Sequence, residues 1–346
     1  MTAGAGLVGC DVAPADRFDL ALVDLDGVAY RGHEPIDGAA EGLTSARTRG
    51  MRLVFVTNNA SREPESVADQ LSDLGIPAQA GEVMTAAQAA AQLLRTRLPH
   101  GAKVLVVGGA GLVTAVRQAG YVVVDSADDE PDAVAQGFAP DVGWMQLSEA
   151  AYAVERGAWY VASNLDLSIP TARGIAPGNG SLVGAVRNAT GVTPDSAGKP
   201  SPTMYRMAVE RAGARETLVI GDRLDTDLAG ARVGGFVGLH VLTGVSTERD
   251  DVLARPDERP HLIAADLRGL LVPHPEPTAG ADGWWSCRDA SARVSDGRLE
   301  LGRGGGDDVE ARLDRVRAAC AAAWAYVDDG GELDASAVPD LTVRGD

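Results

Sequence analysis

The chain has 346 residues, enough for two or three domains, and its 45% hydrophobic but only 4% aromatic residues predict a core of Ala, Val and Leu. Its 49 acidic and 31 basic residues give a formal net charge of −18, which argues against a nucleic-acid partner because phosphate contacts need clustered Lys and Arg. The 3 scattered cysteines predict a reducing, cytoplasmic location, and the lack of a signal peptide or a long apolar run predicts no membrane partner.

The first predicted strand is an apolar run from Leu20 that ends in Asp24 and Asp26. A buried strand cannot pair two carboxylates internally, so we expect both at its carboxyl end, where open α/β sheets bind ligands. Gly27 lets the chain turn at once and leaves backbone N–H groups to face an anion. These residues alone predict either a metal site or two solvated acids.

Alternating elements follow. A helix over 36–50, a strand over 51–56 and a helix from Pro64 predict a doubly wound parallel sheet. The polar residues Thr57, Asn58 and Asn59 come directly after that second strand. A further set of elements predicts a complete smaller α/β domain inserted into the first, with helices over 85–98, 112–120, 147–157 and 182–191 and strands over 103–107, 133–138 and 159–163.

The pattern of the first domain resumes around Lys199. A strand over 218–222 ends in Asp222, a helix runs on from Asp227 to residue 234, and a strand over 236–242 is expected to be the last of the sheet. We therefore predict a catalytic core over 15–82 and 197–270, interrupted by the inserted domain over 83–196.

The carboxyl-terminal region has a different pattern. Three prolines predict a linker over 271–283, and the remaining residues 284–346 predict a small α+β domain. In that domain 284–288 and 299–301 flank an Asp296-Gly297 turn, which is typical of a hairpin, and 309–327 forms an amphipathic helix. This domain carries no catalytic pattern, and we expect it to serve docking or self-association into a homo-oligomer.

The carboxyl ends of parallel strands meet at one edge of a sheet, which should bring several polar side chains together. Carboxylates are hard oxygen ligands that suit Mg²⁺, whereas a hydroxyl, an amide and a lysine can bind phosphate oxygens. The predicted site therefore holds a divalent ion and a phosphate, and its residues are Asp24, Asp26, Thr57, Asn58, Lys199, Asp222 and Asp227.

Four motifs of this chain resemble those of the haloacid dehalogenase-like phosphatases, and the resemblance covers about residues 18–270. In chain order, the motifs are VDLDGV, VTNNA, the lysine of GKPSP, and GDRLDTD. The residues of these motifs are similar to those of the NagD and 4-nitrophenylphosphatase-like subgroup. Members of that subgroup carry a cap domain where this chain has its insertion. The added carboxyl-terminal piece resembles most closely the actinobacterial glycerol 3-phosphate phosphatases.

The resemblance implies a Mg²⁺-dependent phosphomonoesterase with Asp24 as nucleophile and Asp26 as general acid and base. It implies Mg²⁺ ligands from Asp24, the Asp26 backbone and Asp222, with Asp227 orienting Lys199 or a metal-bound water. Phosphate would bind to Thr57, Asn58, Lys199 and Gly27, supported by Asn59. A small phosphorylated metabolite is the implied substrate, glycerol 3-phosphate first, with 4-nitrophenyl phosphate, pyridoxal phosphate and phosphoglycolate as alternatives.

Three interpretations stay open at this point. Asn164, Asp166 and Asn179 either contact substrate from the inserted domain or only shape a turn and a helix start. The glycines around Gly109 follow a strand, as in a dinucleotide site, but Thr114 stands at the third glycine position. Finally, the chain could be a non-catalytic sensor that accepts phosphate on Asp24 without repeated turnover.

Overall fold

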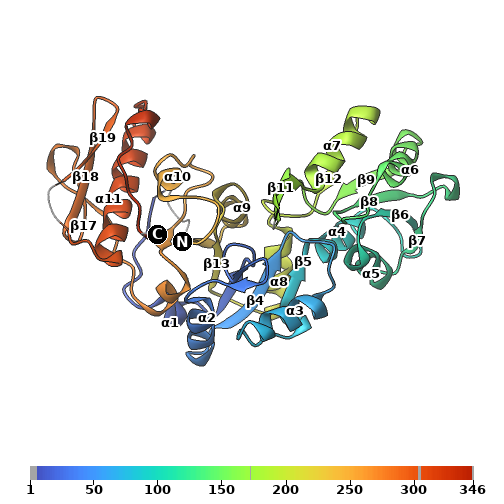
Figure 1. Ribbon diagram of the computed structural model, residues 1–346, viewed down its shortest axis with the longest axis horizontal. Helices are drawn as coiled ribbons and strands as arrows, with labels where there is room; N and C mark the ends of the chain where they lie inside the picture. The colour runs from blue at the N-terminus through green and yellow to red at the C-terminus, as the bar shows by residue number, and fades with distance from the viewer. Residues whose placement is uncertain (1–5, 172, 303–304, 345–346) are drawn as a thin grey trace. The chain divides into compact units, whose positions relative to one another are not determined.

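The computed structural model describes residues 6–171, 173–302 and 305–344. The chain divides into two compact units (Figure 1). The first unit consists of Met1–Leu53 and Ala212–Asp346, and the second unit of Val54–Arg211. The first unit is thus built from both ends of the chain, and the second is one continuous segment. The narrower domain boundaries expected from the sequence stay a prediction.

A parallel sheet forms the centre of the first unit, with strand order β15-β14-β13-β1. Its strands are almost wholly apolar and buried, because helices and loops cover both faces of a parallel sheet. The bounds are β1 (Leu20–Val23), β13 (Thr217–Gly221), β14 (Val237–Val241) and β15 (Leu262–Ala264). The helical segments of this part are α1 (Pro14–Arg17), α2 (Ala39–Thr48), η3 (Leu224–Leu228), α9 (Ala229–Gly234), α10 (Glu248–Val252) and η4 (Leu267–Leu271).

One strand of this sheet corrects the sequence analysis. The strand over 236–242 was expected to be the last, but β15 pairs in parallel beyond it, with Leu239 opposite Leu262. Three residues are too few to show a strand period, so only the pairing reveals β15. A short hairpin of β2 (Tyr30–Arg31) and β3 (Glu34–Pro35) follows β1.

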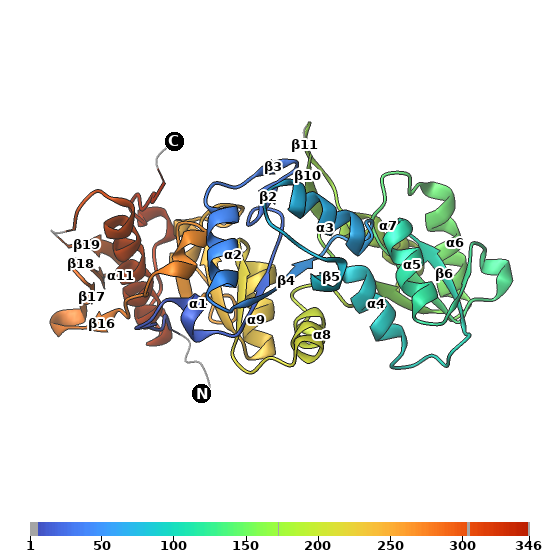
Figure 2. The same ribbon diagram turned by 90° about the horizontal axis from the view of Figure 1, so that it is seen from below.

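An antiparallel sheet and one long helix form the carboxyl-terminal part of the first unit (Figures 1 and 2). The strands lie in the order β16 (Thr278–Ala279), β17 (Trp285–Cys287), β18 (Ala290–Ser295) and β19 (Arg298–Leu301), and α11 (Val309–Asp328) packs against them. The Asp296-Gly297 turn joins β18 to β19, with positive φ at both residues. The expected hairpin partner 284–288 was therefore wrong: it contains β17, which pairs with the other side of β18.

The expected linker is also more ordered than its prolines indicate. His274 is buried and forms an isolated antiparallel bridge with Cys10, and β16 begins at Thr278. Prolines suit extended backbone as well as linkers, which explains the difference. Further short turns are η5 (Ala281–Gly283) and η6 (Ala335–Ala337).

The two parts of the first unit share a hydrophobic core. Leu228 and Ile263, from the parallel-sheet part, lie in one cluster with Val316, Cys320 and Trp324 of α11. The sequence predicted this apolar face of α11 correctly. The carboxyl-terminal segment is therefore part of the same compact body as the parallel sheet.

The second unit contains a parallel sheet of five strands in the order β12-β9-β8-β6-β7. One face packs against α6 and α7 through Val134, Tyr160 and Val183, and the α4–α5 pair belongs to the other side (Figure 1). The sheet strands are β6 (Lys103–Val107), β7 (Val122–Val124), β8 (Ala133–Gln136), β9 (Trp159–Ala162) and β12 (Asp195–Ser196). The helices are α3 (Pro64–Asp73), α4 (Ala86–Leu94), α5 (Ala110–Gln118), α6 (Trp144–Glu155), α7 (Asn179–Thr190) and α8 (Thr203–Ala212).

Several short elements of the second unit were not predicted. They are β7, β12, the antiparallel pair β10 (Ser168–Thr171) and β11 (Gly174–Pro177), the strand β5 (Val83–Thr85) beside the predicted β4 (Arg52–Thr57), and the turns η1 (Ala80–Glu82) and η2 (Ala127–Asp129). The predicted fold class is confirmed, since parallel sheets with flanking helices accompany a carboxyl-terminal α+β part. No helix in the described part of the chain has the length and apolar character needed to cross a membrane.

Candidate active site

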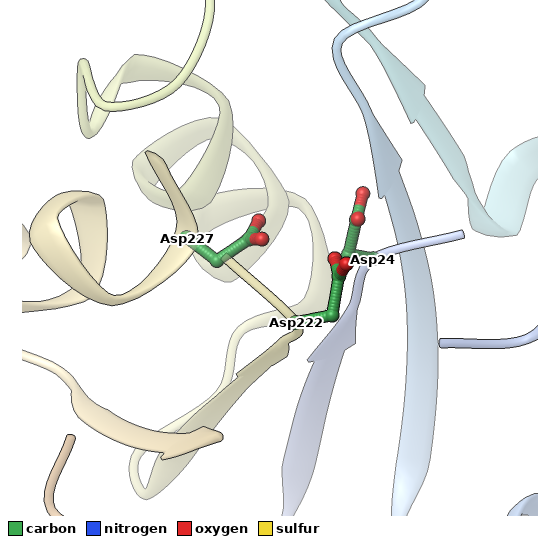
Figure 3. Close-up of side chains that lie close together, drawn as sticks. All are labelled: Asp24, Asp222 and Asp227. Carbon is green, nitrogen blue, oxygen red and sulfur yellow. The ribbon is translucent and has the colours of Figure 1, made fainter. Parts of the chain in front are cut away.

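Three carboxylates meet at the carboxyl end of the parallel sheet in the first unit. Asp24 directly follows β1 and Asp222 directly follows β13, and the two strands are neighbours in register, with Val23 opposite Ile220. Asp227 lies in η3, the turn that follows. One carboxylate oxygen from each of the three residues lies within 4.8 Å of the other two. Figure 3 shows the three side chains. The expected meeting of the first and fourth motifs is therefore present.

The surroundings fix the carboxylate of Asp222. This residue is 0% exposed, and the backbone N–H of Val245 donates to its Oδ2 at 2.7 Å. A Cβ on Gly27 or on Gly244 would overlap the same carboxylate, so both glycines let backbone approach the acid closely. The loop after β14, which includes Gly244 and Val245, thus forms one wall of the site.

Asp227 is held in the turn that it belongs to. It is 0% exposed, its Oδ2 accepts from the backbone N–H of Arg223 at 3.3 Å, and a Cβ on Gly221 would overlap it. Asp225 behaves differently, because it forms an exposed bidentate pair with the guanidinium of Arg223, at 3.1 and 2.8 Å. Asp227, and not Asp225, therefore belongs to the carboxylate cluster. Its predicted action on Lys199 or on a water stays a prediction.

The turn after β1 changes one expectation. Asp26 is exposed there and forms a bridge with Tyr30. The backbone N–H of Gly27 donates to the Tyr30 carbonyl at 2.9 Å, so the expected phosphate donor at Gly27 is already engaged. Glycine is needed at this position for another reason: its φ of 86° is left-handed, and a side chain would strike Asp222. Thr243 also holds this turn, since its hydroxyl donates to the Gly27 carbonyl at 2.6 Å.

The second unit brings the other predicted residues together. The side-chain NH₂ of Asn58 lies 3.1 Å from both carboxylate oxygens of Asp166, and its Oδ1 accepts from the backbone N–H of Lys199 at 2.8 Å. Lys199 is 5% exposed, and the buried Thr57 accepts from the backbone N–H of Asn59 at 3.1 Å. Asn58 therefore joins the second motif to the lysine loop through bonds that occupy its amide. Its role as a phosphate donor stays a prediction.

The buried asparagines of this unit hold backbone in place. Asn164 donates to the Asn58 carbonyl at 2.7 Å and accepts from the backbone N–H of Asp166 at 3.1 Å. Asn179 donates to the Asn164 carbonyl at 2.8 Å and is 1% exposed. These bonds favour the turn-shaping interpretation for Asn164 and Asn179. Of the three expected contacts, only Asp166 is partly exposed, and contact of substrate with it stays a prediction.

Comparisons with known proteins agree with this geometry. The family model described as haloacid dehalogenase-like hydrolase matches residues 21–122, and a HAD-hydrolase-like model matches residues 196–270. The D-glycerol 3-phosphate phosphatase of Mycobacterium tuberculosis is 43% identical over 320 residues, which cover 90% of this chain and 87% of that protein. The chain belongs to the haloacid dehalogenase-like hydrolase family.

Further similar proteins are also phosphatases. The acid sugar phosphatase of Staphylococcus saprophyticus is 39% identical over 68% of this chain and 90% of its own length. A crystal structure of glycerol phosphate phosphatase from Mycobacterium tuberculosis in complex with magnesium superimposes with a TM-score of 0.81 at 42% identity, over 91% of this chain and 92% of that one. The 4-nitrophenylphosphatase of Thermotoga maritima gives 0.69 at 28% identity, over 75% and 98%. The resemblance drawn from the four motifs is confirmed.

The glycines after β6 have a packing role in this hydrolase. A Cβ on Gly109 would press on the backbone of Ser61, and a Cβ on Gly111 would overlap the Arg62 carbonyl. These glycines therefore allow α5 to approach the loop after β4 closely. Packing explains the glycine pattern that had left a dinucleotide site open.

The loop after β14 is a part of the site that was not expected from the sequence. Thr243, Gly244 and Val245 touch Gly27 or Asp222, although the sequence around them indicates only a polar exit from a strand. The place of this loop in the sheet could have indicated its role. The carboxyl end of β14 lies beside that of β13, so its loop had to reach the same edge of the sheet.

A single methyl group at Gly244 should disable the cluster. We expect Gly244→Ala to weaken binding of Mg²⁺ by about tenfold or more, since its Cβ would displace the Asp222 carboxylate while removing no hydrogen-bonding group. Isothermal titration calorimetry with MgCl₂ measures this change. Gly184→Ala is the matched control, because its Cβ would meet no atom within 4 Å. Equal Mg²⁺ affinity in both variants would show that the β14 loop does not shape the site.

Proposed function

We propose that this chain is a Mg²⁺-dependent phosphomonoesterase that hydrolyses a small phosphorylated metabolite, with glycerol 3-phosphate as the first candidate. The carboxylate cluster of Asp24, Asp222 and Asp227, with oxygens within 4.8 Å, is the observation that carries the reaction class. The 43% identity to a D-glycerol 3-phosphate phosphatase over 90% of the chain supports the choice of substrate.

The donor set fits a hard divalent cation. Carboxylate oxygens are the ligands that Mg²⁺ prefers, and the glycines at 27 and 244 leave room for backbone to close around Asp222. We assign the ion to Asp24, the backbone carbonyl of Asp26 and Asp222. When bound, Mg²⁺ offsets the repulsion between an anionic nucleophile and an anionic ester.

The residues of the chain divide the reaction into two displacements. In the first, an Oδ of Asp24 forms a bond to phosphorus, the ester P–O bond breaks, and Asp26 gives its proton to the departing alkoxide. In the second, Asp26 takes a proton from water, the water oxygen bonds to phosphorus, and the bond to Asp24 breaks. Inorganic phosphate leaves, and both carboxyl groups return to their starting states.

The proposed phosphate-binding side chains are residues of the second unit. The Oγ1 of Thr57 accepts a hydrogen bond from the backbone N–H of Asn59. This bond does not use the hydroxyl hydrogen, so the hydroxyl can donate to a phosphate oxygen. The ammonium of Lys199 is a compact point charge on a buried stem, which suits a dianionic phosphate. Asn58 supports this pair by fixing the backbone of Lys199.

A cytoplasmic location is part of the same proposal. Cys10, Cys287 and Cys320 are free and buried, which is the usual condition of cysteines in a reducing compartment. The substrate would be a small metabolite. Self-association through the carboxyl-terminal part stays a prediction.

Sustained phosphate release is the decisive test against a sensor. With 1 mM MgCl₂ and excess glycerol 3-phosphate, we expect phosphate to exceed the enzyme by about a hundredfold or more within minutes, because typical turnover is about 1–10³ per second. EDTA should stop the release and added Mg²⁺ should restore it. A colorimetric phosphate assay, run in parallel with 4-nitrophenyl phosphate, pyridoxal phosphate and phosphoglycolate, ranks the substrates by kcat/KM. A phosphoryl group that stays on Asp24, with less phosphate released than there are chains, would favour the sensor.

A further inference from the structure

A buried histidine–carboxylate pair lies beside the carboxylate cluster. His240 belongs to β14, and its register partner on β13 is Gly221, the residue before Asp222. Its ring is 0% exposed, and Nδ1 lies 2.9 Å from both carboxylate oxygens of Asp251 in α10. Asp251 is also 0% exposed. Neither His240 nor Asp251 takes part in the proposed phosphate transfer.

Burial and the neighbouring acids act on the pKa of His240 in opposite directions. Burial by itself lowers the pKa of His240, but the charge and hydrogen bond of Asp251, followed by the charge and backbone of Asp222, raise this pKa above its ordinary value. Burial raises the pKa of Asp251, and His240 opposes that rise. The imidazole is therefore hydrogen-bonded to Asp251 through Nδ1 and is affected by the charge and backbone of Asp222, whereas no hydrogen bond of Nε2 occurs among the described residues.

The pair is anchored from the far end of the chain. The indole Nε1 of Trp324 in α11 donates to the backbone carbonyl of Asp251 at 2.9 Å. The ring of Trp324 is 2% exposed and lies 5.2 Å from the guanidinium carbon of Arg259. A continuous series of contacts thus leads from α11 through Asp251 and His240 to the strand end that carries Asp222.

We infer that His240 is a positioning residue for the metal site: Asp251 fixes its ring, and the ring holds the Asp222 end of β13 in the arrangement that binds a divalent cation. This inference rests on the proposed Mg²⁺ site. Groups that orient metal ligands without touching the metal commonly change affinity or activity by about 10–100-fold when they are replaced. His240 occupies that place for Asp222.

Direct Mg²⁺ titration tests the inference without any substrate. We expect His240→Asn to weaken Mg²⁺ binding by about 10–100-fold in isothermal titration calorimetry, because the shorter amide keeps a donor toward Asp251 but no longer fills the buried space beside Gly221 at the end of β13. His261→Asn is the matched control. His261 directly precedes β15 and is also buried, but its Nδ1 accepts from the backbone N–H of Gly238 at 3.0 Å, and its pKa is lowered by burial and by the charge of Arg232.

Further measurements separate positioning from general destabilisation. Both histidine variants should lower Tm, but only His240→Asn should need more Mg²⁺ for half-maximal turnover, with kcat recovering toward the parent value at saturating Mg²⁺. Asp251→Asn is a second variant in case His240→Asn does not fold, and we expect it to weaken Mg²⁺ binding in the same direction. Parent-like Mg²⁺ affinity in a folded His240→Asn or Asp251→Asn protein, or an equal loss in His261→Asn, would overturn the inference.

The outcomes also distinguish this inference from the proposed function. If the parent chain binds Mg²⁺ and releases no phosphate from any tested ester, the proposed function fails, and the titrations still decide the role of His240. If the parent releases phosphate and His240→Asn binds Mg²⁺ as tightly, the inference fails alone.

Discussion

Replacing Asp24 by Asn is expected to reduce steady-state phosphate release by about six orders of magnitude, which is the scale of the loss when the nucleophile of a covalent enzyme is removed. An amide oxygen is a poor nucleophile and a weak ligand for Mg²⁺. The fold should be unaffected, because the backbone N–H of residue 24 still bonds the Ile220 carbonyl at 2.9 Å. Phosphate release over many turnovers and a thermal melt measure the two properties separately.

Two companion variants sharpen the interpretation of Asp24→Asn. Asp225→Asn is the matched control, since Asp225 is exposed and pairs only with Arg223 among the contacts described for it, and it should retain near-parent activity. Asp26→Asn should lose most turnover but, with the good leaving group 4-nitrophenolate, still form the bond between Asp24 and phosphorus. Near-parent activity in Asp24→Asn would contradict the covalent mechanism.

Replacing Trp324 by Ala is expected to lower the free energy of unfolding by about 3–5 kcal/mol, the usual cost of truncating a large buried aromatic side chain. The indole is 2% exposed, bonds the Asp251 carbonyl and shares a cluster with Leu228 and Ile263. Urea unfolding followed by circular dichroism gives the difference. The control is Trp144→Ala, which removes an indole from a residue that is 77% exposed and should change stability by less than about 0.5 kcal/mol. Similar losses in both variants would show that α11 is not part of the core.

The strongest sequence signals came from apolar runs that end in acids. The runs before Asp24 and Asp222 predicted two buried parallel strands, and the structure makes them neighbours with their carboxylates together. That prediction worked because burial and strand direction are both local consequences of composition. The apolar face of α11 was recognised for the same reason, since a helical period of 3.6 residues is visible in any window of that length.

Contacts between distant segments could not be predicted in this way. The N–H of Gly27 is taken by Tyr30, and the amide of Asn58 is taken by Asp166, so two expected phosphate donors are engaged in holding the chain. The pairing of His240 with Asp251 could not be predicted from the sequence, because the packing of α10 brings Asp251 to the histidine. Strand β15 has three residues and becomes a strand through pairing with β14.

The division of the chain into two units determines which parts can fold first during translation. All of Val54–Arg211 is one contiguous segment, so it can begin to fold while translation continues. Strand β1 is made early, but its neighbour β13 is added roughly 200 residues later, which takes about ten seconds or more at 5–20 residues per second. During that interval the nascent chain carries an apolar strand without its parallel neighbour. The ribosome must therefore deliver about two thirds of the 346 residues before Asp24 gains Asp222 and Asp227 as neighbours.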